Sequence, residues 1–568
     1  MSARGSNGLG KSICVIGAGA FGLTAVKNFV EEGFEVTCFE RNSYIGGLWH
    51  STLDPTQTST LIGTVSNVSK HLAAYSDFPL PDDYPLYPSA KQIQDYFELY
   101  AEHFNLNKYV QLSTSVISIT RDDEQRRWIV TTKSSDGRSV THMFDRLIMA
   151  TGSLSKPRLP DVAGLNDFEG EVVHSQNFKN PSQYAGQTVL VIGAGATSAD
   201  SIGHLLDAGA VKVYLSHRRK FVVLPRILRG KALDHNVNIR LAIIGGFIGR
   251  VMPKVMLKLR SKMIEGWQNE VFPGLKDHPA LTGARLSGNP ENSIPLISDH
   301  LPDLLLSGKV ESVQGITHIT GPNSVLLTDG TTLDNIDAII CCTGAHVDFS
   351  ALLPPSADPT NPFLAPDGFA ALPSHYRDTG RVPLLYRGII SLQYPHSLAF
   401  LGHTLVLPGS TSVNDLIIMG LAQLWGGKFP FPSQTEMQSE ADSFYASLIS
   451  TLKNGEIAHA GIRSDLAFSR WLHEVAGTGL FEHVGSWTSW RCWKLWWSDR
   501  KFYKMLLDGV MSPHAWRLFD MGRGRKVWSG AREAVEKANA DMRVLEERER
   551  QRLQDAKYME RVREGKIG

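Results

Sequence analysis

The clearest pattern in the chain is an uninterrupted apolar run that leads directly into a cluster of glycines, and it occurs twice. The first run contains Ile13, Val15 and Ile16 and ends at Gly17, and the second, residues 189–192, ends at Gly193. A helix-favouring stretch and another apolar run follow each glycine cluster. Short apolar runs bounded by glycine are typical of strands buried on both faces of a parallel sheet. The pattern therefore predicts an α/β fold with two copies of a strand, loop, helix and strand unit.

The first glycine cluster has the composition of a dinucleotide-binding turn, Gly17-Ala18-Gly19-Ala20-Phe21-Gly22. Glycines permit a tight turn and let the backbone approach a pyrophosphate, and the helix behind them presents unpaired N–H groups. The second strand of this unit ends at Glu40. A carboxylate at that place accepts hydrogen bonds from the hydroxyls of a ribose. This unit is predicted to bind FAD.

The second cluster has the same layout with a different residue type after its second strand. The loop supplies the candidate phosphate-binding residues Gly193, Gly195, Thr197 and Ser198, and the strand is followed by Ser216, Arg218 and Arg219. An acid there would repel the 2′-phosphate of NADPH, whereas guanidinium groups bind a phosphate through charge-assisted hydrogen bonds. The second unit is therefore predicted to bind NADPH rather than NADH.

Composition and charge exclude several other classes of protein. The 58 Lys and Arg residues nearly balance the 57 Asp and Glu residues, so no basic surplus favours nucleic acid as a partner. The five cysteines show neither a Cys-x-x-Cys pair nor metal-type spacing with histidine, so no metal site is expected. The polar N-terminus lacks a signal-peptide core, and no segment reaches the roughly 18 apolar residues of a membrane span. These features predict a cytoplasmic protein without a transmembrane helix.

Further motifs make the chain resemble the flavin-containing monooxygenases. Gly46 with Gly47-Leu48-Trp49 is similar to the turn beside the flavin in that family, and Phe168-x-Gly170-x-x-x-His174-x-x-x-Phe178 matches its identifying motif. The phenylalanine at the last position is the monooxygenase form, because the related Baeyer–Villiger enzymes usually carry tryptophan there. The resemblance implies that this motif links the two dinucleotide domains, so we interpret His174 as structural.

Asn67 is the candidate catalytic residue. It lies in Ser66-Asn67-Val68-Ser69-Lys70, which resembles the segment whose asparagine, in the family, lies beside the flavin and the bound nicotinamide. A neutral amide can donate a hydrogen bond to a peroxy group without protonating it. The alternative is a turn asparagine in a polar loop.

The resemblance implies an NADPH- and FAD-dependent monooxygenase. NADPH would reduce FAD, dioxygen would add to give a 4a-hydroperoxyflavin, and this adduct would oxygenate a nitrogen or sulfur centre of a small organic metabolite, an N-oxygenation in the first case. Two departures from the family pattern are Ala345, where an aromatic residue usually follows Thr343-Gly344, and Ala422-Gln423-Leu424-Trp425 in place of Gln-Ala-Arg-Trp. They favour a dedicated metabolite of secondary metabolism. Baeyer–Villiger oxidation of a ketone is the nearest alternative. A non-oxygenating flavoprotein reductase and a non-catalytic nucleotide-binding scaffold are alternatives of other classes.

These units predict two Rossmann-like domains, with the NADPH domain inserted in a discontinuous FAD domain. The FAD domain is expected to comprise residues 10–180 and 335–568, with a helical C-terminal extension, and the NADPH domain residues 181–334. The strand at residues 338–342 is expected to lead back into the FAD domain.

Two segments outside these units carry apolar residues at helical spacing. In residues 246–264, Arg250, Lys254, Lys258 and Lys262 recur every four residues beside an apolar stripe, Phe247, Val251, Val255 and Leu259. This pattern predicts an inserted basic amphipathic helix, which either contacts an anionic membrane peripherally or is an ordinary solvated helix with a core-facing stripe. Trp487, Trp490, Trp493 and Trp497 are interpreted as a packing stripe, with a substrate channel or membrane contact as the alternatives.

Overall fold

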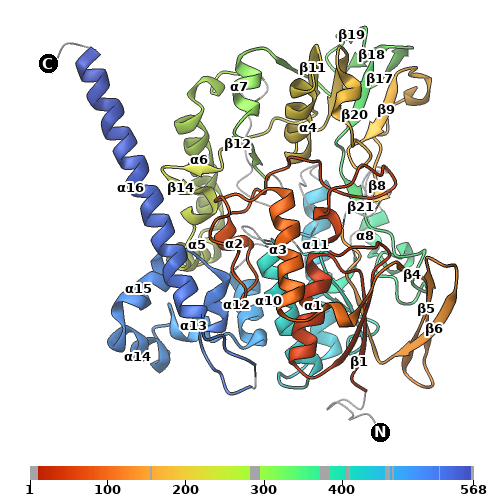
Figure 1. The fold of residues 1–568 in the computed structure, drawn as a ribbon, viewed down its shortest axis with the longest axis vertical. Helices are drawn as coiled ribbons and strands as arrows, with labels where there is room; N and C mark the ends of the chain where they lie inside the picture. The colour runs from red at the N-terminus through yellow and green to blue at the C-terminus, as the bar shows by residue number, and fades with distance from the viewer. Residues whose placement is uncertain are drawn as a thin grey trace.

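The computed structural model describes residues 10–153, 156–279, 281, 294–370, 383–404, 406, 410–453, 461–463, 466–523 and 525–563. Two parallel-strand sheets dominate this fold and lie at opposite ends of the molecule, as Figure 1 shows. The α/β class predicted from the sequence is confirmed.

The first sheet contains the first glycine-loop unit. Its strand order is β22-β23-β24-β7-β1-β2-β3, and the pairs around β1 are parallel. Almost all of the side chains of β1 and β7 are buried, because helices cover one face of the sheet and residues of the strands β4, β5 and β6 pack on the other. This explains why these strands read as continuous apolar runs. The strands are β1 (Ser12–Ile16), β2 (Glu35–Phe39), β3 (Val110–Gln111), β7 (Arg146–Met149), β22 (Leu385–Tyr386), β23 (Ile390–Ser391) and β24 (Leu398–Phe400), with the helices α1 (Ala20–Glu31), α3 (Ala90–His103) and α10 (Ser410–Trp425).

The second sheet contains the second glycine-loop unit and is parallel throughout, in the order β16-β11-β10-β20-β9. Its central strands are buried in a separate apolar core. The elements are β9 (Glu171–His174), β10 (Thr188–Ile192), β11 (Lys212–Ser216), β16 (Val310–Val313) and β20 (Ala338–Cys341), with the helices α4 (Ala196–Asp207) and α7 (Leu301–Leu306).

Two strands lie in a different sheet from the one that our domain division assigned them to. The strand expected to lead back into the FAD domain, β20, pairs with β10 on one side and β9 on the other, so both β9 and β20 belong to the second sheet. The segments that join the two units are β8 (Lys156–Pro157) and β21 (Ala345–His346), which pair with each other. We therefore propose that the second unit begins and ends at this ribbon, rather than at residues 181 and 334.

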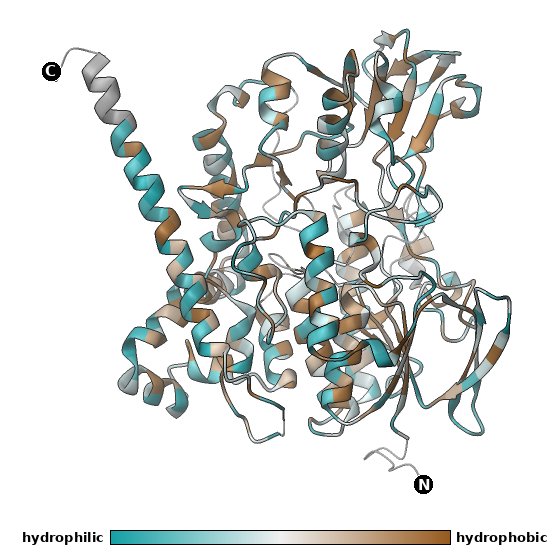
Figure 2. Ribbon diagram, viewed as in Figure 1, coloured by the Kyte–Doolittle hydropathy of each residue, from teal (hydrophilic) through white to brown (hydrophobic). Residues whose placement is uncertain are grey.

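Helices form most of the C-terminal third. A buried ion network joins this region to the first unit, because Arg517 contacts Glu31 of α1 at 3.2 Å and Asp77 at 3.4 Å. The last helix runs along the side of the molecule and is largely hydrophilic (Figures 1 and 2). The helices are α11 (Gln434–Lys453), α12 (Leu466–Ala476), α13 (Leu480–His483), α14 (Trp490–Ser498), α15 (Arg500–Asp508) and α16 (Ala531–Arg563).

The segment predicted as one basic amphipathic helix forms two helices, α5 (Ile239–Val251) and α6 (Pro253–Val271), which separate where Pro253 occupies the first turn of α6. The expectation of a core-facing stripe is wrong, since Phe247, Val251, Val255 and Leu259 are all exposed. The tryptophans also differ from a packing stripe, because Trp490 is 76% exposed and Trp497 84%. Among the helices described, none is both long and apolar enough for a membrane crossing.

Smaller elements connect these parts. A three-stranded antiparallel sheet, β4-β5-β6, lies beside the first unit, and another, β17-β18-β19, beside the second. These and the remaining short elements are β4 (Thr114–Asp122), β5 (Arg127–Ser134), β6 (Ser139–Phe144), β12 (Val223–Leu224), β13 (Ile227–Leu228), β14 (Lys231–Ala232), β15 (Leu296–Ile297), β17 (Ile316–Gly321), β18 (Ser324–Leu327), β19 (Thr332–Leu333), α2 (Lys70–Ala73) and α8 (Asp367–Ala370).

Candidate functional site

The first glycine loop is a backbone cradle that side chains would fill. Gly17 has φ 101°, and a Cβ there would lie 2.6 Å from the carbonyl oxygen of Ala150. A Cβ on Gly22 would lie 1.8 Å from the carbonyl oxygen of Gly17. Helix α1 begins at Ala20 behind Gly19, which has no side chain to cap the first N–H groups. These features suit a phosphate at the helix N-terminus.

Glu40 lies at the carboxyl end of β2 and borders this loop. Its buried carboxylate accepts a hydrogen bond of 2.8 Å from the N–H of Ala18 and one of 2.9 Å from the N–H of Asn42. A carboxylate has about four lone-pair positions, so both oxygens retain capacity for ribose hydroxyls. The donor and acceptor chemistry of the loop and Glu40 therefore fits the adenosine diphosphate part of FAD.

The turn beside the loop brings a second piece of backbone against it. Gly46 is left-handed, with φ 98°, and its N–H donates to the carbonyl of Ala18 at 2.9 Å. A Cβ on Gly47 would lie 3.1 Å from the Cα of Gly19, so the two backbones are in close approach. The predicted flavin-side residues Gly47, Leu48 and Trp49 form the single 3-10 turn Gly47–Trp49. The structure thus brings the first loop and this turn together, as predicted from the sequence.

The second glycine loop repeats this backbone geometry. Gly193 has φ 110°, and a Cβ there would lie 2.5 Å from the carbonyl oxygen of Cys342. The N–H of Gly193 donates to Ser216 at 2.9 Å, just as the N–H of Gly17 donates to Phe39 at 2.8 Å. A Cβ on Gly195 would meet nothing within 4 Å, so the loop has free space in front of α4. This arrangement fits a second dinucleotide.

Two serines predicted to contact the second cofactor are engaged by the protein instead. The buried Ser198 hydroxyl donates to the Gly195 carbonyl at 2.6 Å and accepts from the Gly195 N–H at 2.9 Å, so it caps α4. Ser216 is also buried, and its hydroxyl donates to the carbonyl of Gln314 at 2.9 Å. Thr197 is exposed at the first turn of α4. Of the three hydroxyls, that of Thr197 is the accessible one.

Arg218 and Arg219 follow β11 and are exposed on the same turn. The side chain of Arg218 lies against Gly315, because a Cβ on that glycine would be 2.6 Å from Cγ of Arg218. Two adjacent guanidinium groups at the end of the second strand are the chemistry that a 2′-phosphate requires. That they bind the 2′-phosphate of NADPH stays a prediction.

His217 occupies the place in the second unit that Glu40 occupies in the first, one residue after the strand, and sequence analysis did not identify it. It is buried, its Nδ1 donates to the Arg219 carbonyl at 2.8 Å, and its Nε2 accepts from the Ser312 hydroxyl at 2.7 Å. Burial lowers the pKa of His217, which favours the neutral ring that these bonds need. His217 therefore shapes the turn that carries both arginines. Its position could have been recognised from the sequence, because it follows its strand just as Glu40 follows the corresponding strand of the first unit.

Asn67 lies on a turn whose backbone is tightly held. The N–H of Ser66 donates to the Pro88 carbonyl, and the hydroxyl of Ser66 contacts the N–H and the carbonyl of Val68. The Oδ1 atom of Asn67 is buried and has no hydrogen-bond partner in the protein. A buried polar atom without a partner is costly, so this amide suits a group that the folded chain alone does not supply.

His174 serves the structure rather than the chemistry. Its Nε2 donates to the Gly344 carbonyl at 2.8 Å and its Nδ1 accepts from the N–H of Gln176 at 3.2 Å. A Cβ on Gly170 would lie 2.3 Å from the carbonyl oxygen of Asp337, and Phe178 is buried in the core of the second unit. Each fixed position of this motif thus contributes to packing or to backbone contacts.

The cysteines do not form a redox pair. All five are free, and burial raises the pKa of both Cys341 and Cys342 to about 12. A thiol must ionise to exchange with a disulfide. A non-oxygenating flavoprotein reductase of the disulfide-reducing kind would need an ionisable cysteine pair, which these thiols do not provide.

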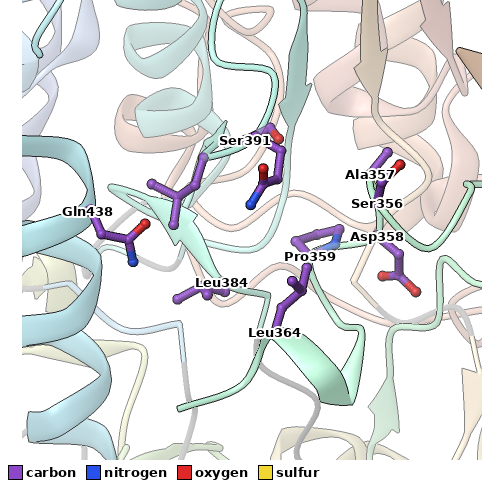
Figure 3. Close-up of a pocket in the computed structure, with 10 residues that line it drawn as sticks. Ser356, Ala357, Asp358, Pro359, Leu364, Leu384, Ser391 and Gln438 are labelled. Atoms are coloured by element: carbon purple, nitrogen blue, oxygen red, sulfur yellow. The ribbon is translucent and has the colours of Figure 1, made fainter. Parts of the chain in front are cut away.

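Two cavities lie away from the glycine loops. One of about 140 Å³ opens between the loop at residues 356–359 and α11, where the side chains of Asp358, Leu384, Ser391 and Gln438 line it (Figure 3). Another of about 330 Å³ is lined by Arg121, Arg126, Tyr394 and His396, among others. No residue predicted to contact FAD or NADPH lines either cavity, so we do not assign them to the site.

Comparison with known proteins identifies the relatives of this chain. A family model described as flavin-binding monooxygenase-like matches residues 10–357. The chain is 34% identical to monooxygenase aurF of Gibberella zeae, over 93% of this chain and 98% of that protein. It is 29% identical to dimethylaniline monooxygenase (N-oxide-forming) 4 of Mus musculus, over 93% and 87%.

Solved structures share the fold at low sequence identity. S-allyl-L-cysteine S-oxygenase from Allium sativum superposes with a TM-score of 0.59 at 18% identity, covering 93% of this chain and 98% of that one. Cyclohexanone monooxygenase from Rhodococcus sp. Phi1 bound to NADP⁺ superposes with a TM-score of 0.57 at 17% identity, covering 82% and 97%.

Proposed function

The chain belongs to the flavin-binding monooxygenase-like family, and from that premise we propose that it uses FAD, NADPH and dioxygen to oxygenate a nitrogen or sulfur centre of a small organic metabolite. The observation that carries the proposal is the pair of glycine loops. They share one backbone geometry, but Glu40 follows the second strand of one and Arg218 and Arg219 follow that of the other.

We assign FAD to the first loop and NADPH to the second. Residues 17–22 and the turn at Gly47, Leu48 and Trp49 would hold the FAD phosphates and ring, with Glu40 on its ribose. Gly193, Gly195 and Thr197 would hold the NADPH pyrophosphate, with the two arginines on the 2′-phosphate. Ser198 and Ser216 support the loop through the backbone contacts described above.

When bound, the reduced flavin supplies the chemistry that activates dioxygen. The protein binds and orients the reactants and excludes water from them. Asn67 is the proposed catalytic residue. Its amide nitrogen offers a neutral hydrogen-bond donor, and its buried Oδ1, which has no protein partner, can accept a hydrogen bond from a bound group. Replacing it with alanine is expected to leave NADPH consumption in place while more hydrogen peroxide and less oxygenated product form.

Baeyer–Villiger oxidation of a ketone is the second candidate, since enzymes named cyclohexanone monooxygenase share the fold. Phe178 at the end of the identifying motif and the N-oxide-forming relative favour the first. We would incubate the purified holoenzyme with a tertiary amine, a thioether and a cyclic ketone, and identify the products by mass spectrometry. An N-oxide or sulfoxide is expected. A lactone as the sole product would reverse the assignment.

We further propose that α5 and α6 bind an anionic membrane surface peripherally. They present exposed apolar side chains at helical spacing, among them Phe247, which is 68% exposed. Residues 241–264 contain five basic residues and no acid. Basic amphipathic helices of this kind lie in the headgroup region of anionic bilayers.

The exposed tryptophans extend this proposal. Helix α5 packs against the segments on both sides of α14, because Arg240 at the start of α5 pairs with Asp508 at the end of α15, and Ile243 lies against Gly485 ahead of α14. Tryptophan favours the boundary between lipid and water. Five unpaired cysteines and the preference for anionic lipid suggest the cytoplasmic face of a membrane.

Vesicle flotation tests this surface with a matched pair of variants. Phe247→Ser should reduce binding to phosphatidylserine-containing vesicles by about tenfold or more, because burying a phenylalanine contributes roughly 1.5–3 kcal/mol. Phe363→Ser, at a still more exposed phenylalanine outside α5 and α6, is the control. Absence of wild-type binding, or equal loss in both variants, would refute the membrane contact.

A further inference from the structure

Arg226 is a buried cation of the second unit whose side chain reaches into the first. It follows β12, and its guanidinium Nε donates to the Ser66 carbonyl at 3.3 Å while Nη2 donates to the Val65 carbonyl at 3.4 Å. Its own carbonyl accepts hydrogen bonds from the Tyr87 hydroxyl and from the N–H of Leu233. Arg226 is therefore held by both units at once.

The two carbonyls that Arg226 binds immediately precede Asn67. The Ser66 carbonyl belongs to the peptide that joins Ser66 to Asn67, so a donor fixed on this oxygen fixes the plane of that peptide. The direction of the Asn67 side chain depends on this plane. A planar guanidinium can hold two neighbouring carbonyls, whereas an ammonium group presents one nitrogen.

On its other side Arg226 is anchored to the second unit. Its N–H and its Nη1 donate to the two carboxylate oxygens of Asp299, each at 2.9 Å. Burial raises the pKa of Asp200, and the nearby charge of Arg226 offsets part of this rise. Asp200 lies in α4, the helix that begins at the second glycine loop. Arg226 thus lies between that helix and the Asn67 turn.

We propose that Arg226 is a positioning residue that orients the Asn67 amide relative to the second dinucleotide loop. It acts through the Val65 and Ser66 carbonyls and touches no reacting atom. The inference rests on the proposed role of Asn67 and extends it, because it makes the placement of that amide depend on the docking of the second unit.

The test compares Arg226→Lys with Asp299→Asn. The lysine keeps the charge but loses the two-carbonyl contact, whereas the asparagine removes the ion pair and leaves the contact to Val65 and Ser66. Two readouts are measured: amide hydrogen exchange of residues 64–70 in protein without cofactors, and hydrogen peroxide formed per NADPH consumed in the holoenzyme.

We expect Arg226→Lys to speed exchange at residues 64–70 and to raise peroxide per NADPH, each on the order of tenfold, since a hydrogen bond from a charged donor is lost. Asp299→Asn keeps an oxygen that can accept from Arg226 and leaves the contacts to Val65 and Ser66, so it should change both readouts in the same direction but clearly less. Wild-type exchange and coupling in Arg226→Lys would overturn the proposal. So would equal effects of the two substitutions, because they would show that the ion pair alone matters.

Failure of the positioning role can be distinguished from failure of the proposed function. If Asn67→Ala remains fully coupled, Asn67 has no catalytic role, and the exchange experiment still reports whether Arg226 holds the turn. If Asn67→Ala uncouples the enzyme and Arg226→Lys changes neither readout, the function stands and this inference is wrong.

Discussion

The two glycine loops differ in one decisive position on a shared backbone. In both, the first glycine is left-handed, its N–H donates to the last strand residue, and a Cβ would meet a carbonyl oxygen at 2.6 Å or 2.5 Å. The residue directly after the second strand differs. In the first unit the Glu40 carboxylate accepts a hydrogen bond from the N–H of Ala18, whereas in the second unit the His217 ring donates one to the Arg219 carbonyl. We therefore expect the shared backbone to fix where a pyrophosphate binds, and the residues after each second strand to select the ribose.

The largest expected effect comes from filling the first cradle. Gly22→Ala would place a Cβ 1.8 Å from the Gly17 carbonyl oxygen, so we expect a loss of about 3 kcal/mol in the free energy of unfolding and no retained FAD. Denaturant unfolding and flavin absorbance measure both. The matched control in the second loop is Gly195→Ala, where a Cβ meets nothing; it should keep its stability and its FAD. Normal flavin content in Gly22→Ala would contradict the cradle.

The next effect concerns the exposed arginines. Arg218→Ala should weaken the binding of NADPH by roughly 10- to 100-fold, which corresponds to one charge-assisted hydrogen bond to phosphate. The binding of NADH should remain almost unchanged. Kinetic constants for the two nucleotides measure this. Lys212→Ala, which removes a half-buried cation paired with Glu311 at the opposite end of β11, is the control. Equal losses for NADPH and NADH would show that Arg218 does not bind the 2′-phosphate.

Exchanging the residue after the strand sharpens the comparison further. His217→Glu places in the second unit the side chain that the first unit carries. Its negative charge should repel the 2′-phosphate and reduce the preference for NADPH over NADH by about tenfold, an effect that added salt would diminish. An unchanged preference would mean that the arginines alone determine it.

The smallest effect is a pH dependence of stability. Burial lowers the pKa of His217 below the value near 6.5 that it has in the unfolded chain. Between these two pKa values the native state binds fewer protons than the unfolded state, so the free energy of unfolding rises with pH. The contribution is complete above about pH 6.5 and is lost as the pH falls below it, by at most about 1.4 kcal/mol per pH unit. His217→Gln should flatten the profile between pH 7 and 5.5. A variant as pH-sensitive as the wild type would exclude this histidine as a source.

Local sequence was sufficient where one short segment contains the whole reason for a structure. The glycine loops, Glu40 and the two arginines are of this kind, because strand, turn and helix follow one another within about 30 residues. The apolar character of β20 was equally clear from the sequence, but its sheet was not. Only the fold shows that β20 lies between β10 and β9.

For several other side chains, the contacts could not be read from the sequence. Ser198 and Ser216 looked like phosphate ligands, and their hydroxyls are occupied by the carbonyls of Gly195 and Gln314. The exposed tryptophans have the spacing of a core stripe, and spacing alone does not say whether another element covers them. Arg226 has no motif at all, and its role follows from contacts 160 residues away in the chain.

The most direct test of the account is anaerobic rapid mixing of the purified, FAD-loaded protein with NADPH and, separately, with NADH, while the absorbance of oxidised flavin is followed. The account predicts that NADPH reduces the flavin fully and at far lower concentration than NADH. Protein that binds no flavin, or bound flavin that NADPH does not reduce, would contradict the assignment of the two loops.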